Sequence, residues 1–231
     1  MHNKITKAVT ASLMAAAMLT TTVATIAPMS VSAGQVLGEN DFTYKALPWH
    51  TCETNPAKQT FELTSDGTFH VTVKEPGGAA AGGESRWDLQ FRHRNLTFKA
   101  GHTYKIHWEV KVSRPGIQIN TKIGNIKGDE EYWNNNNAGP HGGGTWNPII
   151  TINSTEWQKF DSTWTCPQNL EGVEWAFHYG GAGANQPTPC TQSGDEIWFD
   201  NMSIEDTTGS EGDWKGGQDN LSALGVMNRD N

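Results

Sequence analysis

Hydrophobic and polar residues alternate along short stretches of this chain, and turn-forming residues separate one stretch from the next. Alternation with a period of two is typical of a β-strand that buries one face. The pattern predicts strands over residues 58–63, 68–73, 86–94, 103–112, 117–124, 147–152, 157–166, 173–180 and 197–206. No stretch has a sustained helical period, so we expect an all-β protein.

The spacing of these strands indicates how they are arranged. Asp66-Gly67 is a favourable dipeptide for a hairpin turn between the first two predicted strands. The glycine-rich segments 76–85 and 134–144 are interpreted as loops, because strong strand patterns resume after each of them. Short strands at this spacing predict an antiparallel β-sandwich, most simply a jelly roll.

Alternation also assigns a face to each side chain of the strand at 173–180. One face carries aromatic residues and the other carries polar ones: Trp175, Phe177 and Tyr179 alternate with Glu174, Ala176 and His178. Turning the polar face inward would bury a carboxylate and an imidazole, which costs several kcal/mol if they are unpaired. We therefore expect the aromatic residues in the core, and Glu174 and His178 on the open face.

The strand predicted at 86–94 has the same two-faced character. Its apolar set is Trp87, Leu89, Phe91 and His93, and its polar set is Arg86, Asp88, Gln90, Arg92 and Arg94. A solvated outer face would normally contain Ser and Thr, and this row has none. The pattern favours a ligand surface, although an ordinary solvated face remains open.

The two ends of the chain differ from the middle. Residues 1–33 have an early pair of lysines, an apolar stretch and a small-x-small site that ends at Ala33, which predicts a cleaved secretory signal peptide. A membrane anchor is disfavoured, because threonines interrupt the apolar stretch and no basic cluster follows it. The sequence thus predicts a secreted, extracellular protein with one domain over 34–206. Residues 207–231 lose the alternation and are interpreted as a flexible tail or linker.

Composition narrows the choice of partners. The formal net charge is −8 and the basic residues are scattered, so nucleic acid and anionic membranes are poor partners. Ten tryptophans and 25 glycines favour β-structure with broad loops and neutral polar ligands that stack on rings. Three cysteines in an oxidising compartment predict one disulfide, for which Cys166 and Cys190 are favoured because they flank the strand at 173–180. A pairing of Cys52 with either remains open.

Several segments, in order, resemble carbohydrate-binding modules of families 4, 9 and 22. They are GENDF with LPWH, RWDLQF followed by LTFKAGHTYKIHWEV, STEWQKFDSTWT, EWAFHYGG and IWFDNMSIED, and they span roughly residues 38–206. The nearest resemblance is to modules that lead bacterial cellulases. It implies a β-jelly roll with a concave sheet that binds a glucan or xylan chain, acts as a monomer, and targets an attached glycoside hydrolase to its polysaccharide.

The resemblance also implies which residues contact sugar and which bind a structural calcium ion. Asp200 of the closing strand corresponds to the residue that touches Ca²⁺. Where relatives have a sugar-stacking Tyr, this chain reads WHTCE, so either Trp49 replaces that platform or the groove lacks it. The implied sugar contacts are Trp49, Gln90, Arg92, Arg94, Asn120, Lys122, Asn125, Glu174, His178 and one of Tyr132 and Trp133.

The residues alone support a sugar ligand as well. A sugar ring offers C–H groups on its faces and hydroxyls on its rim, so it needs flat aromatic rings and polar side chains. Tyr132, Trp133 and Trp146 lie in a glycine- and asparagine-rich segment without alternation, where exposed rings are expected. A disordered loop with incidental tryptophans remains the alternative.

Two other classes of function compete with a binding module. A glycosidase needs two carboxylates about 5–10 Å apart, and Glu174 has no convincing second. Intrinsic catalysis is therefore disfavoured, and no catalytic residue or catalytic cofactor is assigned. An adhesion or structural sandwich without a sugar site is the third class, and the polar sheet face argues against it. The sequence leaves the polysaccharide open among β-1,4-glucan, mixed-linkage glucan and xylan.

Overall fold

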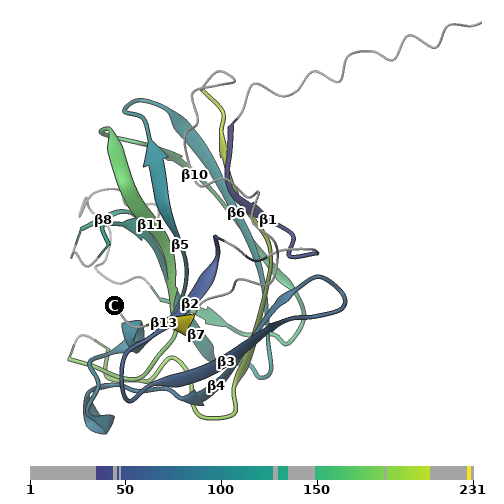
Figure 1. Ribbon diagram of the computed structural model, residues 1–231, viewed down its shortest axis with the longest axis vertical. Coiled ribbons are helices and arrows are strands. Elements are labelled where there is room, and N and C mark those ends of the chain that lie inside the picture. The colour runs from purple at the N-terminus through teal and green to yellow at the C-terminus, as the bar shows by residue number, and fades with distance from the viewer. Residues whose placement is uncertain are drawn as a thin grey trace, which may run out of the picture. The chain divides into compact units, whose positions relative to one another are not determined.

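The computed structural model describes residues 35–43, 46, 48–126, 130–134, 149–184, 186–208 and 228–229. Within these ranges the regular structure consists of two β-sheets and two short 3-10 helices, η1 (Ala79–Ala81) and η2 (Arg86–Asp88) (Figure 1). The all-β prediction is confirmed. The predicted signal peptide and most of the predicted tail lie outside the described residues. In the described ranges, no helix is long and apolar enough to cross a membrane.

Sheet A is antiparallel. Its strands lie in the order β10 (Gln158–Thr165), β6 (Thr103–Val112), β12 (Glu196–Asp206), β4 (Phe69–Glu75) and β3 (Lys58–Leu63), and β1 (Gln35–Asn40) also pairs with β12. The hairpin between β3 and β4 turns at Asp66-Gly67 as predicted, with Gly67 at φ 84° and its N–H donating to the Thr64 carbonyl at 3.1 Å. Glycine suits this turn because it adopts positive φ without steric cost.

Sheet B provides the other layer. Its order is β13 (Asn228–Arg229), β2 (His50–Glu53), β5 (Leu89–Phe98), β11 (Leu170–His178), β7 (Ile117–Gly124) and β8 (Glu131–Asn134), and β9 (Ile150–Ile152) pairs separately with β7. All these pairings are antiparallel except that of β13, which runs parallel to β2. Strands β5 and β11, side by side in Figure 1, form the middle of this sheet.

The core lies between the two sheets and is rich in aromatic rings. Phe91 of sheet B stacks on Phe199 of sheet A with ring centroids 4.6 Å apart, and Phe177 meets Trp108 edge-on at 5.0 Å. Trp175, Phe177 and Tyr179 have no exposed surface, so the predicted orientation of their strand is confirmed. Burying one such side chain contributes about 1.5–3 kcal/mol, which makes this face the main support of the sandwich.

The start of the strand predicted at 86–94 is corrected. Residues 86–88 form η2, and Trp87 is half-buried outside the core. Asp88, expected on the open face, is buried and accepts hydrogen bonds from the N–H groups of Gly78 (2.7 Å) and Glu84 (2.8 Å). The carboxylate of Asp88 thus accepts hydrogen bonds from the backbone of the glycine-rich loop. The alternation of a strand begins after it, at Leu89.

The predicted disulfide between Cys166 and Cys190 is not formed, and both side chains are buried thiols. Cys166 precedes β11, with its N–H bonded to the His102 carbonyl at 2.9 Å, whereas the Cys190 N–H bonds to the Gly180 carbonyl at 3.0 Å beyond the end of β11. A nine-residue strand spans about 30 Å, and a disulfide requires Cα atoms within about 7 Å of each other. Residues that flank a strand in sequence therefore lie at its opposite ends.

Candidate functional site

One face of sheet B gathers polar side chains from five strands. Ala176 on β11 lies between Arg92 on β5 and Lys122 on β7, and His178 lies between Gln90 and Asn120. This set, called the polar face below, consists of His50, Gln90, Arg92, Arg94, Asn120, Lys122, Asn134, Glu174 and His178. Apart from Arg94, which is half-buried, each is at most 6% exposed. The structure thus brings together the polar residues that the sequence predicted on β5, β7 and β11.

Glu174 is surrounded by positive charge. Its carboxylate lies 3.3 Å from Arg94 Nε, 3.8 Å from Arg92 Nη1 and 3.7 Å from Lys122 Nζ. Lys122 also donates to the backbone carbonyl of Asn125 at 3.2 Å. A buried carboxylate needs such partners to offset its lost hydration. Glu174 therefore acts as the counter-ion that fixes three cationic side chains on the polar face.

His178 is the polar side chain of this face whose hydrogen-bonding capacity is unused. Neither ring nitrogen has a hydrogen-bond partner, although the residue is only 5% exposed. Burial, together with the charges of Lys122, Arg86 and Arg92, holds the pKa of this imidazole well below its usual value. The ring is therefore neutral at physiological pH and offers one N–H donor and one nitrogen acceptor.

A short chain of hydrogen bonds orders the polar face between β2 and β5. Arg92 donates from Nε to His50 Nε2 at 3.1 Å and from Nη1 to Gln90 Oε1 at 3.2 Å. Because His50 Nε2 accepts, its Nδ1 carries the proton and donates to the Pro48 carbonyl at 3.0 Å. The sequence reasoning missed His50, since its four-residue strand is too short to show a pattern.

The edge of the polar face at β7 and β8 contains Tyr132. Its hydroxyl donates to the Glu130 carboxylate, which also accepts from Asn125 Nδ2 at 3.0 Å. Tyr132 is 7% exposed, and this hydrogen bond raises its pKa. Tyr132 and Asn125, both predicted sugar contacts, thus lie together next to Lys122.

Two predicted aromatic platforms are wrong. Trp49 has no exposed surface and stacks on Phe91 in the core at 4.7 Å. Trp133 is 1% exposed and pairs with Ile123, a core residue, because 131–134 is a strand and not part of a loop. Both rings lie in the hydrophobic core, on the side of sheet B opposite the polar face, and cannot stack on a ligand there. Trp146 lies outside the described residues.

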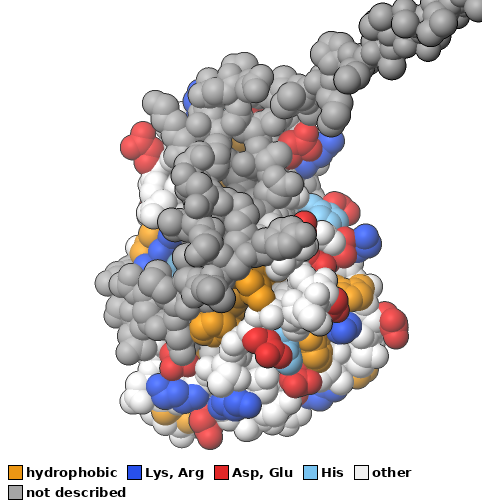
Figure 2. Space-filling view, turned by 45° about the vertical axis from the view of Figure 1, so that its right-hand side comes forward, with side chains coloured by type: hydrophobic (Ala, Val, Ile, Leu, Met, Phe, Trp, Pro, Cys, Tyr) orange, Lys and Arg blue, Asp and Glu red, His pale blue; other side chains and the backbone are white. Residues whose placement is uncertain are grey.

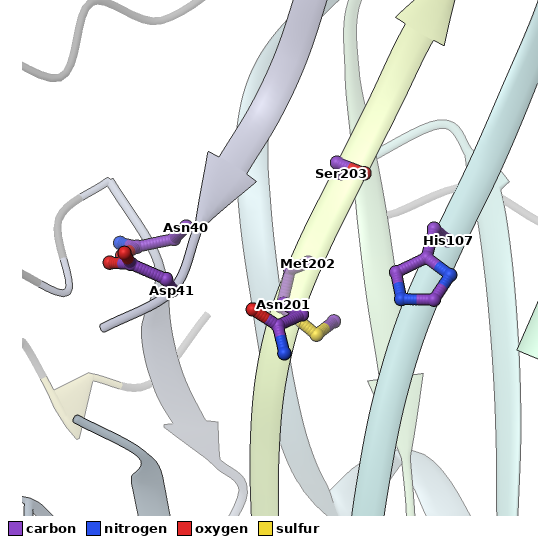
Figure 3. A pocket seen from close by; sticks show the side chains of 6 residues that line it. All are labelled: Asn40, Asp41, His107, Asn201, Met202 and Ser203. Carbon is purple, nitrogen blue, oxygen red and sulfur yellow. The ribbon is translucent and has the colours of Figure 1, made fainter. Parts of the chain in front are cut away.

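Asp200, the predicted calcium ligand, lies on sheet A. It pairs with Glu109 across β6, and burial raises its pKa to about 6, with the carboxylates of Glu109, Asp41 and Asp66 adding to the rise. A pocket beside it is lined by Asn40, Asp41, His107, Asn201, Met202 and Ser203 (Figure 3). In the described part of the chain, no three His, Cys, Asp or Glu side chains form a metal-binding group. One carboxylate with backbone and amide oxygens is nevertheless a donor set that suits Ca²⁺.

Comparisons with known proteins bear on the family and the fold. The family model described as a carbohydrate binding domain, CBM_4_9, matches residues 34–189. A cellulose 1,4-beta-cellobiosidase of Acetivibrio thermocellus is 30% identical over 160 residues, which is 62% of this chain and 16% of that enzyme. The chain therefore spans a small part of this relative.

Two solved structures extend the comparison. A structure titled "CBM4 structure and function" has a TM-score of 0.51 at 20% identity, and covers 76% of this chain and 96% of that one. The N-terminal cellulose-binding domain of Cellulomonas fimi beta-1,4-glucanase C has a TM-score of 0.47 at 14% identity, and covers 74% of this chain and 95% of that one. The first of these likenesses confirms the β-sandwich fold.

Proposed function

Because this chain belongs to the carbohydrate binding domain family, we propose that it is a non-catalytic module that binds β-glucan or cellulose chains of plant cell walls at the polar face. The observation that carries the proposal is His178, a buried imidazole whose two nitrogens have no partner. A sugar hydroxyl both donates and accepts hydrogen bonds, so a pair of neighbouring hydroxyls satisfies both nitrogens. Gln90 and Asn120, directly opposite on the two flanking strands, extend this row of polar groups.

The proposal includes weak binding. Without a tryptophan platform among the described residues of the face, hydrogen bonds carry most of the contact energy. Ordering a flexible polysaccharide chain offsets much of that energy. We expect dissociation constants of about 10 µM to 1 mM, which correspond to roughly −4 to −7 kcal/mol.

A catalytic role is the weaker candidate. Glu174 is the carboxylate that a glycosidase on this face would use, but it ion pairs with Arg92, Arg94 and Lys122. A glycosidase needs a second carboxylate across the cleft, and Glu174 is the one carboxylate in the set that defines the polar face. The matched relative is named as a cellobiosidase. We infer that this module targets such a glycoside hydrolase, and that the protein is exported by the signal peptide predicted at 1–33.

Calcium binding is part of the proposal. Asp200 is a partly buried carboxylate with three acidic neighbours, and a cation at its side would relieve their repulsion. The site lies on sheet A, whereas the polar face belongs to sheet B. An ion there would stabilise the fold without contacting the sugar.

Titration calorimetry and affinity electrophoresis test the proposed function. The chain would be tested against cello-oligosaccharides, mixed-linkage β-glucan and xylo-oligosaccharides, with reducing-sugar release measured on the same samples. Binding of at least one of these without sugar release is expected. Lack of binding to every plant glycan, or turnover of any of them, would overturn the proposal.

A further inference from the structure

The polar face is positively charged, although the chain as a whole has a formal net charge of −8. Arg92, Arg94 and Lys122 supply three positive charges and Glu174 supplies one negative charge, which gives 3 − 1 = +2 before any contribution of the histidines. Elsewhere the two signs are mixed: Figure 2 shows acidic and basic side chains interspersed over the visible part of the described surface. The excess of positive charge is therefore a local property of this face.

The contact with Glu174 leaves the ammonium of Lys122 able to bind a further anion. Glu174 lies 3.3, 3.8 and 3.7 Å from Arg94, Arg92 and Lys122, whereas Arg114 and Asp195 meet at 2.7 Å through two hydrogen bonds. Tight charged hydrogen bonds fall at about 2.7–2.9 Å. The contact of Lys122 with Glu174 is longer than this, and an ammonium has three N–H donors, so Lys122 can also donate to a second anion.

The positive potential reaches the place where a ligand is proposed to bind. Lys122, Arg86 and Arg92 each disfavour a proton on His178, which means that each projects positive charge onto that ring. A neutral sugar does not use this potential. A glycan with a carboxylate gains attraction to Lys122 and the arginines while its hydroxyls bond to His178.

We propose that the polar face selects glycans that carry uronic-acid carboxylates over neutral glycans with the same backbone. This inference rests on the proposed function, since it assigns the substrate class of the same face. Lys122 is the main determinant, because its ammonium lies on the strand next to β11 and its nearest contacts are one carbonyl oxygen at 3.2 Å and the distant Glu174 carboxylate.

The experiment compares charged and neutral probes that share a backbone. Carboxymethylcellulose is paired with hydroxyethylcellulose, and glucuronic-acid-branched xylo-oligosaccharide with the unbranched one, at 20 and 500 mM NaCl. We expect the acidic member of a pair to bind about tenfold more tightly at low salt, and the difference to shrink at high salt as the charges are screened. Lys122→Gln should remove most of the preference. Lys105→Gln, an exposed lysine on sheet A, is the matched control and should keep it.

The outcomes separate this inference from the proposed function. Equal affinity for the charged and neutral probes, with no dependence on salt, would overturn the inference and leave the function intact. A preference that survives in Lys122→Gln would also overturn it. Lack of binding to all four probes and to every other glycan would overturn both.

Discussion

His178 lies directly opposite Gln90 across the ladder of β5 and β11, and both nitrogens of its buried imidazole have no hydrogen-bond partner. A buried polar group in this state destabilises the free protein and strengthens any ligand that satisfies it. We therefore predict that His178→Ala leaves the melting temperature unchanged or raises it, while glycan affinity falls about tenfold or more. Paired melting and calorimetry measure both. His107→Ala on sheet A is the control for affinity, and an unaffected affinity in His178→Ala would refute the assigned role.

Truncation of the core aromatic residues should lower the stability of the protein. Trp175 packs in the core and donates from Nε1 to Thr121 Oγ1 at 2.9 Å. Truncation to Ala of Trp175 or Phe177 should lower the free energy of unfolding by about 3–5 kcal/mol. Trp133→Ala should do the same, since its ring is buried beside Ile123. Denaturant titration measures the loss. A folded Trp133→Ala protein with lost affinity would show instead that this ring contacts sugar.

The sequence predicts most of the strands because their patterns are local. Residues 103–112 and 117–124 form β6 and β7 with the predicted bounds, since alternation and turn residues agree at both ends. Alternation predicts that Glu174 and His178 share the face opposite Trp175 and Phe177, and the register confirms this. The expectation that both side chains are open to solvent is wrong, since Glu174 is 4% and His178 5% exposed.

What the sequence does not predict depends on pairing between distant segments. The short strand β8 looks like part of a loop, and only its pairing with β7 directs Trp133 into the core. Trp49 belongs to no predicted strand, so alternation assigns it to neither face. Only its stacking on Phe91 shows that its ring lies in the core. The contacts of Glu174 with cations on two neighbouring strands are likewise visible only once β5, β11 and β7 are in register.

Glu174→Gln tests the counter-ion role of this carboxylate. The change keeps the shape of the side chain but leaves the charges of Arg92, Arg94 and Lys122 without their shared partner. Breaking a buried charge network from one side costs about 3–5 kcal/mol. We expect a loss of that order in the free energy of unfolding, measured by denaturant titration. The control is Glu171→Gln, an exposed carboxylate on the same strand, which should change stability by less than about 0.5 kcal/mol. Equal effects of the two changes would argue against the network.

Calcium should stabilise the chain through Asp200. An ion that binds only the folded state raises the melting temperature by mass action, so a chelator should lower it by several degrees and added Ca²⁺ should restore it. Asp200→Asn should abolish the response to Ca²⁺. Glycan affinity at room temperature should remain unchanged, because Asp200 lies on sheet A and the polar face on sheet B. Scanning calorimetry with and without chelator tests this prediction. A melting temperature that changes with neither chelator nor Ca²⁺ would exclude the ion.

Stability should fall in mild acid, and His93 contributes to this fall. This residue is buried beside Trp49, with ring centroids 5.3 Å apart, and burial lowers its pKa to about 3. The unfolded chain binds a proton at this histidine near pH 6.5, whereas the folded protein does so only near pH 3. The stabilising difference is therefore complete above pH 6.5 and is lost as the pH falls from 6.5 towards 3.

The size and the origin of this loss can both be measured. A tenfold change in proton affinity is worth about 1.4 kcal/mol, so His93 alone accounts for a loss of about 3 kcal/mol at pH 4. His178 adds to it with the same sign, while Asp200, whose pKa is raised to about 6, opposes it as the pH falls below 6. Denaturant titration at pH 7, 5.5 and 4.5 should give a shallower slope for His93→Gln and a steeper one for Asp200→Asn than for the parent chain. Identical slopes for the parent chain and His93→Gln would show that burial of this imidazole does not govern stability in acid.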